Sequence, residues 1–258
     1  MSNSPIEKIT DPSFTESAKG LMTLFCIGVI HLVIGVELTD VKIAIPWFPT
    51  ITFKRPEYLV FLYWGFNFYA IYRYILHNIS CFRKYWFSSL YNGLQNPLGE
   101  KFIFQTIWHR DSSAPYTVSK SGTNISINGY YIETDPHSPP GQYHQENVCF
   151  FTFNFTKNYK FKGITCSAAP HYTADEVLFD KPETKKKWGL TLFVDDEGFE
   201  EFKSNYVKSK LYRFKLFSLT VIPYTRLAFT TKAIFDLTLP IVLIVLLFGA
   251  TVISATIA

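Results

Sequence analysis

Lysines alternate with aromatic residues in one short stretch of the chain, Lys157–Lys162, which reads KNYKFK. Basic side chains neutralise phosphates, and the faces of aromatic rings stack on nucleobases without reading a particular base sequence. The stretch therefore predicts a binding site for a nucleotide-type anion, with Lys157, Tyr159, Lys160 and Lys162 as its ligand-binding residues. The alternative interpretation is a solvated strand face that lies opposite a buried one.

A second basic cluster joins three consecutive lysines to an aromatic residue: Lys185, Lys186, Lys187 and Trp188. The same chemistry makes these four residues candidate ligand-binding residues, and an ordinary solvated loop is the alternative. The segment from Lys203 to Lys232 carries seven basic residues and no acidic one. Such a segment next to a membrane span favours contact with an anionic inner leaflet.

Signatures of catalysis are missing from the sequence. The patterns GxSxG, HExxH, Walker A and GxGxxG do not occur, and the four cysteines form no CxxC pair. His109, His137, His144 and His171 are scattered, and isolated histidines are more often surface groups than metal ligands. We therefore expect no enzyme, no cofactor and no metal centre. A membrane-bound hydrolase with unfamiliar motifs is the enzymatic alternative.

The composition is that of a membrane protein. Of the 258 residues, 48% are hydrophobic and only 18% are charged, against about 25% charged in a typical soluble protein. The apolar residues gather in three long runs: Leu21–Leu38, Tyr58–Leu76 and Ile234–Ile257. A helix of about 20 apolar residues crosses a bilayer. The runs predict a transmembrane hairpin followed by a C-terminal transmembrane helix. A cleavable signal peptide is the alternative for the first run, but no A-x-A site follows it.

The basic residues that flank the spans set the expected orientation. They concentrate around the large middle region, which the positive-inside rule places in the cytoplasm. The predicted organisation is an N-terminal cytosolic segment (1–20), a transmembrane hairpin (21–76, with helices at about 21–38 and 58–76), a cytosolic β-rich sensor domain (77–232) and a C-terminal transmembrane helix (233–258).

The middle region reads mainly as short strands, typical of an antiparallel sheet or a small barrel. The predicted strands are Phe102–Trp108, Asn124–Glu133, Cys149–Thr156, Asn158–Cys166 and Leu190–Val194. Asn128-Gly129 is interpreted as a turn. The fold class is therefore an α+β membrane protein.

Other segments have their own predictions. A short hairpin or extended connection is expected at Val41–Lys54, and helices at 77–98 and Asp195–Lys210. Leu211–Pro223 is apolar and β-like, and 135–141 is expected to be an exposed loop.

Polar residues inside apolar spans usually face a partner or water, because their burial in lipid is costly. Asn67, Thr251 and Ser254 are on that ground the predicted pore-lining residues. Three spans cannot enclose an aqueous path alone, so a pore needs a homo-oligomer. The alternative is that the serine and threonine hydroxyls bond carbonyls of their own helix.

The stretch from Pro46 through FKRPEYL (Phe53–Leu59) to Tyr72-Arg73-Tyr74 resembles small bacterial membrane proteins of anti-phage operons, in particular the transmembrane effectors of the Hailong defence system. The resemblance extends to the layout of the whole chain. It implies a tetrameric channel in the bacterial inner membrane, whose opening depolarises that membrane. It also implies control by single-stranded DNA oligomers that a partner nucleotidyltransferase makes.

The expected function is thus an ion channel of anti-phage defence, gated by a nucleotide or single-stranded DNA oligomer bound to its cytosolic domain. The expected partners are the lipid bilayer, further copies of the chain and the nucleotide ligand, with a nucleotidyltransferase encoded nearby. The alternative is a non-catalytic accessory membrane subunit that binds a protein partner.

Overall fold

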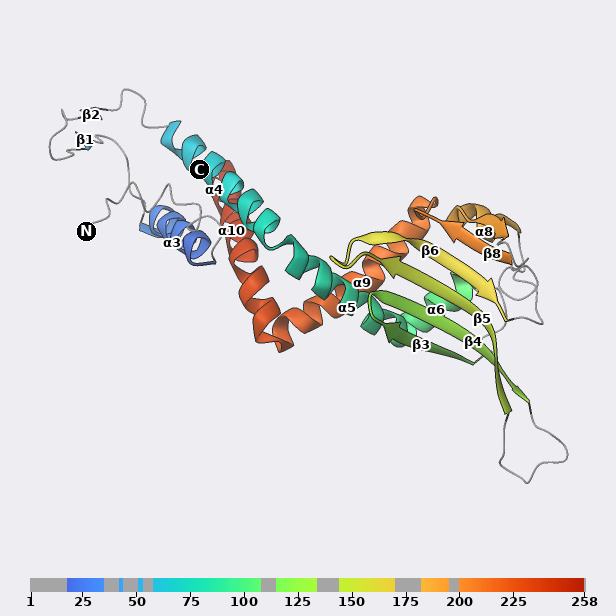
Figure 1. Ribbon diagram of the computed structural model, residues 1–258. Coiled ribbons are helices and arrows are strands. Elements are labelled where there is room, and N and C mark those ends of the chain that lie inside the picture. The colour runs from blue at the N-terminus through green and yellow to red at the C-terminus, as the bar shows by residue number, and fades with distance from the viewer. Residues whose placement is uncertain are drawn as a thin grey trace, which may run out of the picture. The chain divides into compact units, whose positions relative to one another are not determined.

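The computed structural model describes residues 18–34, 42–43, 51–52, 58–107, 115–133, 144–169, 182–194 and 200–257. The chain divides into two compact units (Figure 1). One unit, here called the helical unit, comprises residues 1–79 and 228–258. The other, here called the sheet unit, comprises residues 80–227.

Three long helices are described in the helical unit: α3 (Ala18–Ile34), α4 (Tyr58–His77) and α10 (Lys232–Ile257). Among the described residues, α10 alone is both long and apolar enough to cross a membrane, with a mean hydropathy of 2.5 over its most apolar stretch. α3 is a shorter apolar helix. The predicted C-terminal apolar helix is confirmed, whereas membrane crossing by α3 and α4 stays a prediction.

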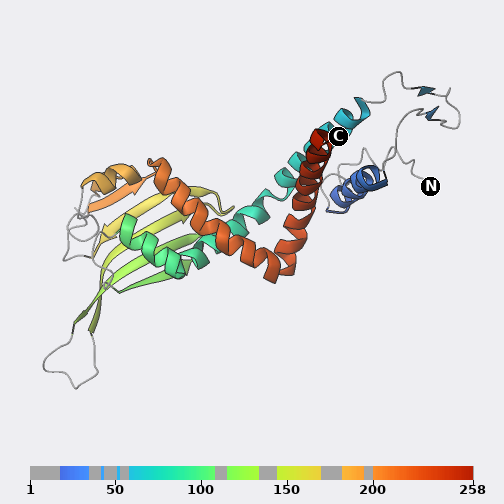
Figure 2. The ribbon, with the colours of Figure 1, turned by 180° about the vertical axis from the view of Figure 1, so that it is seen from behind.

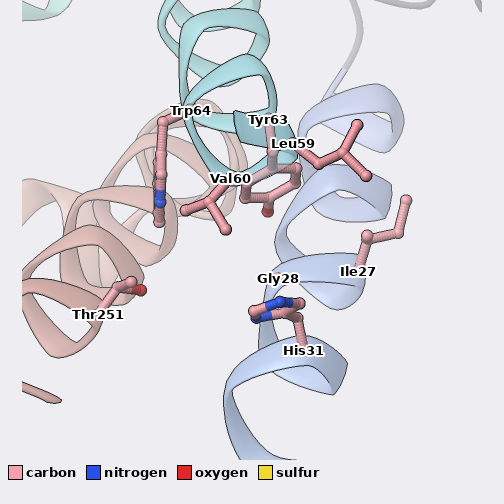
Figure 3. Close-up of a pocket in the computed structure, with 8 residues that line it drawn as sticks. All are labelled: Ile27, Gly28, His31, Leu59, Val60, Tyr63, Trp64 and Thr251. Atoms are coloured by element: carbon pink, nitrogen blue, oxygen red, sulfur yellow. The ribbon is translucent and has the colours of Figure 1, made fainter. Parts of the chain in front are cut away.

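Hydrogen bonds from two tyrosines of α4 join it to the other two helices. The hydroxyl of Tyr63 donates to the carbonyl of Leu24 in α3 at 2.6 Å. The hydroxyl of Tyr74 donates to the carbonyl of Leu237 in α10 at 3.1 Å. The three helices line a partly open cavity, to which Tyr63 also contributes (Figure 3).

A short ladder lies between α3 and α4 in the sequence. β1 (Lys42–Ile43) and β2 (Ile51–Thr52) pair antiparallel, with Lys42 opposite Thr52. This agrees with the predicted hairpin at Val41–Lys54.

The sheet unit contains one open antiparallel sheet with the strand order β3-β4-β5-β6-β8-β7. It is therefore the open sheet and not the barrel that the strand spacing also allowed. The strands are β3 (Tyr116–Ser121), β4 (Asn124–Glu133), β5 (His144–Phe155), β6 (Phe161–Ala168), β7 (Thr191–Val194) and β8 (Glu200–Ser204).

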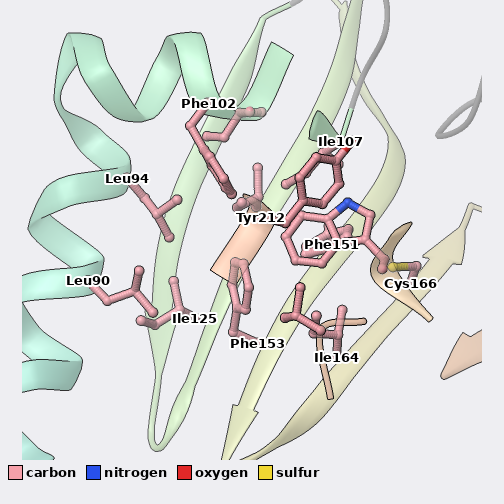
Figure 4. Close-up of a cluster of buried hydrophobic side chains, with 14 of the residues drawn as sticks. Leu90, Leu94, Phe102, Ile107, Ile125, Phe151, Phe153, Ile164, Cys166 and Tyr212 are labelled. Atoms are coloured by element: carbon pink, nitrogen blue, oxygen red, sulfur yellow. The ribbon is translucent and has the colours of Figure 1, made fainter. Parts of the chain in front are cut away.

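Helices cover one face of this sheet, as Figures 1 and 2 show from opposite sides. They are α5 (Ile79–Gln95), α6 (Pro97–Thr106) and α9 (Lys210–Thr230), and a short helix, α8 (Pro182–Trp188), precedes β7. Side chains alternate across a strand, so every second residue of the central strands points toward the helices. Phe151 and Phe153 of β5 are buried there against Leu94 of α5 and Phe102 of α6 (Figure 4).

The strand predicted at Phe102–Trp108 is wrong. Residues 97–106 form helix α6, with Pro97 in its first turn and Glu100 following it. Proline at this position is compatible with a helix start as well as with a stop. Phe102, Ile103 and Thr106 are buried together, and this spacing follows a helical face rather than an alternating strand.

The turn predicted at Asn128-Gly129 is also wrong. Both residues lie within β4, where the pairing with β5 shifts register between Gly129 and Tyr130. The turn comes earlier, at Gly122-Thr123 between β3 and β4, and Gly122 adopts a φ of 58°. A side chain disfavours that backbone conformation, so glycine suits the position.

Two predictions near the C-terminal end are wrong as well. The segment predicted as a helix, Asp195–Lys210, contains strand β8, and its residues 195–199 lie outside the described part. The β-like Leu211–Pro223 belongs to helix α9. A continuous apolar run does not distinguish a buried strand from a buried helix by periodicity. The predicted loop at 135–141 lies outside the described residues.

Candidate ligand-binding cleft

A cleft of about 470 Å³ lies within the sheet unit, and we call it the basic cleft. Four parts of the unit line it: helix α5, the hairpin between β5 and β6, the segment that follows β8, and helix α9. Its lining residues are Arg83, Trp86, Leu90, Phe153, Phe155, Tyr159, Lys160, Phe161, Tyr206, Val207, Arg213, Leu216, Phe217 and Thr220.

Three cationic side chains line the basic cleft, and each comes from a different element. Arg83 is on α5, Lys160 is in the β5–β6 hairpin and Arg213 is on α9. No carboxylate is among the lining residues. Within the described part of the chain, none of the three has an ion pair or a side-chain hydrogen bond. Their donors are free for an anion, and arginine forks match phosphate geometry especially well.

Aromatic rings form much of the remaining wall. The rings of Trp86 on α5 and Phe217 on α9 lie 5.5 Å apart between centroids. Phe217 is 55% exposed and Tyr206 is 62% exposed, so each offers a ring surface to a ligand. Planar faces of this kind stack on nucleobases. The combination of free cations and exposed rings suits a ligand that carries both a phosphate and a flat ring.

The β5–β6 turn holds Tyr159 at the cleft. The amide of Tyr159 donates to the carbonyl of Thr156, and the amide of Thr156 donates to the carbonyl of Lys160, both at 2.8 Å. Tyr159 has a φ of 56°, a left-handed conformation that is strained for a residue with a Cβ atom. Its ring packs on Phe87 with 5.1 Å between centroids. The turn and this ring contact together fix the side chain.

Only half of the predicted cluster Lys157–Lys162 lies at the basic cleft. Tyr159 and Lys160 line the basic cleft, whereas Lys157 and Lys162 are exposed on the same hairpin and are not among the lining residues. Strand β6 begins at Phe161, so Lys162 belongs to the strand and not to the turn.

The second predicted cluster, Lys185, Lys186, Lys187 and Trp188, forms the C-terminal part of helix α8 and is not among the residues of the cleft. Lys187 forms an ion pair with Glu183 at 3.7 Å. The ammonium of Lys185 lies 4.6 Å from the ring centroid of Phe202, and burial lowers the pKa of Lys185. Lys186 is exposed. Lys185 and Lys187 are thus in contact with a ring and a carboxylate beside α8.

Trp188 is a core residue in this structure. Its side chain is fully buried, and its indole Nε1 donates to the carbonyl of Thr106 at 2.6 Å. Rings of Phe151 and Tyr212 lie 5.1 Å and 5.2 Å from it. With its faces covered by core neighbours, Trp188 presents no surface on which a base could stack.

The sequence reading missed the helical residues of the cleft. Arg83 and Trp86 are three positions apart on α5, and Arg213 and Phe217 are four apart on α9, so each pair shares a helix face. A cation and an aromatic residue three or four positions apart on a helix could have predicted both pairs. On α9 the interpretation of Leu211–Pro223 as β-like concealed this spacing.

The predicted pore-lining residues differ in their surroundings. Asn67 is fully buried, its Nδ2 donates to the carbonyl of Tyr63 at 2.8 Å, and its Oδ1 has no partner within the described residues. The hydroxyl of Thr251 donates to the carbonyl of Leu247 at 2.8 Å, whereas Ser254 is exposed. Thr251 thus makes the bond to its own helix that the alternative reading expected.

The candidate catalytic histidines give no site to describe. His109, His137 and His171 lie outside the described residues, and the surroundings of His144 are likewise not described. The described residues contain no group of three histidine, cysteine or acidic side chains that could hold a metal ion.

No family model, no curated protein and no solved structure matches the chain. The proposed function therefore rests on the chemistry of the basic cleft.

Proposed function

We propose that the protein is an oligomeric membrane effector whose sheet unit binds a nucleotide or a single-stranded DNA oligomer in the basic cleft, and whose helical unit forms an ion-conducting pore. The proposal places the helical unit in the bacterial inner membrane as a multi-pass structure, with the sheet unit in the cytoplasm. Opening of the pore would depolarise the membrane, in keeping with the resemblance to Hailong effectors and a role in anti-phage defence.

The observation that carries the proposal is the chemistry of the basic cleft. Arg83, Lys160 and Arg213 supply positive charge without a neighbouring carboxylate in the lining, and Phe217 and Tyr206 expose ring faces. A phosphate needs the charge and a nucleobase needs the rings, so one ligand uses both kinds of group.

Chain connectivity supports a link between the cleft and the membrane helices. α5, which carries Arg83, follows α4 after the single residue Asn78. α9, which carries Arg213, precedes α10 with the single residue Thr231 between them. A ligand that contacts both α5 and α9 therefore acts on helices that continue into α4 and α10. Such a ligand shifts a closed–open equilibrium if it binds the two states with unequal affinity.

The test is reconstitution of the full-length protein in liposomes with a potential-sensitive dye, followed by addition of ATP, cyclic nucleotides or short single-stranded oligodeoxyadenylates. We expect at least one of these to change the rate at which the potential is lost. Arg213→Gln and Lys160→Gln should each weaken the apparent affinity about tenfold, since a charge-assisted hydrogen bond contributes roughly 1.5 kcal/mol or more.

Lys162→Gln is the matched control, because Lys162 is an exposed lysine of the same hairpin outside the cleft lining. It should leave the affinity close to that of the wild type. If the folded, reconstituted protein keeps the membrane tight with every candidate ligand, the channel proposal fails. If Lys162→Gln and Lys160→Gln weaken binding equally, the cleft is not the binding site.

A second candidate function, an accessory membrane subunit with a protein partner, is favoured by the edge strand β7. Leu192, Phe193 and Val194 are each more than half exposed on this edge. An apolar edge strand is a template for pairing with another chain. This function predicts a stable heteromeric complex on purification from the native host and no current from the protein alone.

A further inference from the structure

A cavity of about 260 Å³ lies among the three described long helices of the helical unit (Figure 3). We call it the helical cavity. α3 contributes Ile27, Gly28 and His31, α4 contributes Leu59, Val60, Tyr63 and Trp64, and α10 contributes Thr251. None of these residues lines the basic cleft, which lies in the sheet unit.

The helical cavity is partly open to the outside, since Ile27 in its lining is 51% exposed. Its volume is that of a ligand site, because an apolar cavity of about 150 Å³ already admits a benzene molecule. At about 260 Å³, the helical cavity has room for several methylene groups of an organic ligand.

Water is poorly matched to the walls. A buried water needs about two to four polar partners. The hydroxyl of Tyr63 donates to the carbonyl of Leu24, and the hydroxyl of Thr251 donates to the carbonyl of Leu247. His31 and the indole N–H of Trp64 are the remaining polar groups of the lining, while Ile27, Leu59 and Val60 are apolar. The lining therefore suits a hydrocarbon.

The surfaces around the cavity indicate the source of that hydrocarbon. The three helices expose large apolar side chains, among them Val33 of α3, Phe61 and Leu62 of α4, and Leu246 of α10, each more than 60% exposed. Such a surface belongs in the acyl region of a bilayer and not in water. Lipid chains are then the apolar molecules present in highest concentration next to the cavity.

We infer that the helical cavity binds one acyl chain of a membrane lipid. The inference rests on the proposed membrane location of the helical unit, but it adds a ligand and a site that pore formation does not require. The bound acyl chain would contact all three helices, because each of them contributes to the lining.

Trp64 supplies the test, because its indole lines the cavity and is quenched at short range by brominated acyl chains. The full-length protein in detergent is titrated with dibrominated phosphatidylcholine, and the Trp64→Phe variant is titrated in parallel. The difference between the two titrations isolates the signal of Trp64. We expect quenching that saturates at one lipid per chain.

Two variants that fill the cavity provide the specific comparison: Val60→Phe on α4 and Ile27→Phe on α3. Each should weaken the saturable quenching about tenfold, because the enlarged side chain displaces methylenes whose burial contributes to binding. Leu62→Phe is the matched control, since Leu62 is on the same helix, is 70% exposed and is outside the lining. It should leave the quenching unchanged.

Equal quenching in Val60→Phe and Leu62→Phe, or quenching that rises linearly without saturation, would overturn the inference. So would a complete absence of quenching, which would mean that another part of the chain or a second copy fills the cavity. Flotation with phosphatidylcholine vesicles separates the two proposals. Protein that floats but shows no saturable quenching contradicts the lipid site alone, whereas protein that does not float contradicts the proposed membrane location.

Discussion

At the residue scale, Tyr159 combines backbone strain with a place in the basic cleft. Its left-handed conformation, with φ at 56°, costs about 1–2 kcal/mol for a residue other than glycine. Glycine or asparagine would form this turn more readily. Strained residues that the surrounding structure holds in place concentrate at functional sites. The ring contact with Phe87 gives the tyrosine a structural role, and its place in the cleft lining offers a reason to tolerate the strain.

The variant Tyr159→Asn tests whether the tyrosine ring stacks on a nucleobase independently of phosphate binding. Asparagine tolerates the left-handed turn but lacks the ring. We expect the affinity for ATP or an oligodeoxynucleotide to fall about tenfold, since aromatic stacking contributes roughly 1–3 kcal/mol per base. The affinity for pyrophosphate should not change. Isothermal titration calorimetry measures both, with Tyr159→Phe as the variant that keeps the ring. A parallel loss for both ligands would show that the turn itself had been disturbed.

Cys166 makes the stability of the sheet unit sensitive to alkaline pH. The thiol is fully buried on β6, and this burial raises its pKa well above the ordinary value of 9.0. Below pH 9 the thiol is protonated in both the folded and the unfolded chain. As the pH rises above 9, the unfolded chain ionises first, so stability falls by up to about 1.4 kcal/mol per pH unit until the raised folded pKa is reached.

We therefore expect Cys166→Val to lose less stability than the wild type between pH 8 and pH 10. Valine is apolar and similar in size, so the core stays filled. Thermal unfolding followed by circular dichroism at these two pH values provides the measurement. Burial also raises the pKa values of Tyr116 and Tyr212, so these phenols affect stability only above pH 10. Both proteins contain them, and they do not contribute to the difference. Parallel losses in the two proteins would contradict this role of the thiol.

At the element scale, the sheet and its helices depend on a close approach between α5 and α9. A Cβ atom at Gly93 of α5 would lie 2.5 Å from the carbonyl oxygen of Leu219 on α9. That oxygen belongs to the backbone and cannot rotate away. Glycine at this position therefore sets the distance between the two helices that carry Arg83 and Arg213 of the basic cleft.

Gly93→Ala should destabilise the sheet unit by about 1–2 kcal/mol, in the upper part of the range that the two opposing effects allow, because the clash is with backbone. Overpacking costs about 1–3 kcal/mol, and replacing a helical glycine by alanine returns up to about 1 kcal/mol. A melting temperature lowered by several degrees is the expected result. Gly249→Ala is the control, because a Cβ there meets nothing within 4 Å. It should be neutral or slightly stabilising, and an equal loss in both variants would contradict the packing argument.

Element prediction succeeded for the strands of the sheet centre and failed for apolar segments whose pattern fits a strand and a helix alike. The alternating residues Cys149, Phe151 and Phe153 lie buried on β5, as predicted. The alternation at Phe102–Trp108 fits a strand or a helix equally well, and burial against the sheet selects helix α6 for residues 97–106. Tertiary contacts decided these ambiguous segments, because local propensities differ by less than the free energy of burying an apolar face.

At the scale of the whole molecule, two units of different character share the chain. The sheet unit has an apolar core in which Phe87, Phe151 and Trp188 are fully buried. The described helices of the helical unit have fewer buried side chains and expose many large apolar ones, such as Phe61 and Leu246, although α9 and β7 of the sheet unit expose some as well. The proposal that the helical unit lies in a membrane starts from this exposure, because lipid tolerates apolar side chains on a helix surface.

A charge on the outer face of α10 tests the membrane location. Leu246 is 63% exposed near the middle of the helix. We expect Leu246→Arg to reduce the fraction of protein that resists alkaline carbonate extraction, because arginine at a helix centre costs about 2.5–3.5 kcal/mol on insertion. Leu246→Phe should be retained like the wild type. Full retention of Leu246→Arg would contradict exposure of this face to lipid.

Local patterns were sufficient to identify the apolar C-terminal helix and the strands β4, β5, β6 and β7, and they named two residues that line the basic cleft. Each of these depends on neighbours a few positions apart, such as Tyr159 and Lys160 in one turn. The tertiary structure alone brought Arg83 and Arg213 to the same cleft as Lys160, and it placed Trp188 in the core. Helix packing across the sheet joins residues more than a hundred positions apart, and no short-range periodicity encodes which of their faces meet.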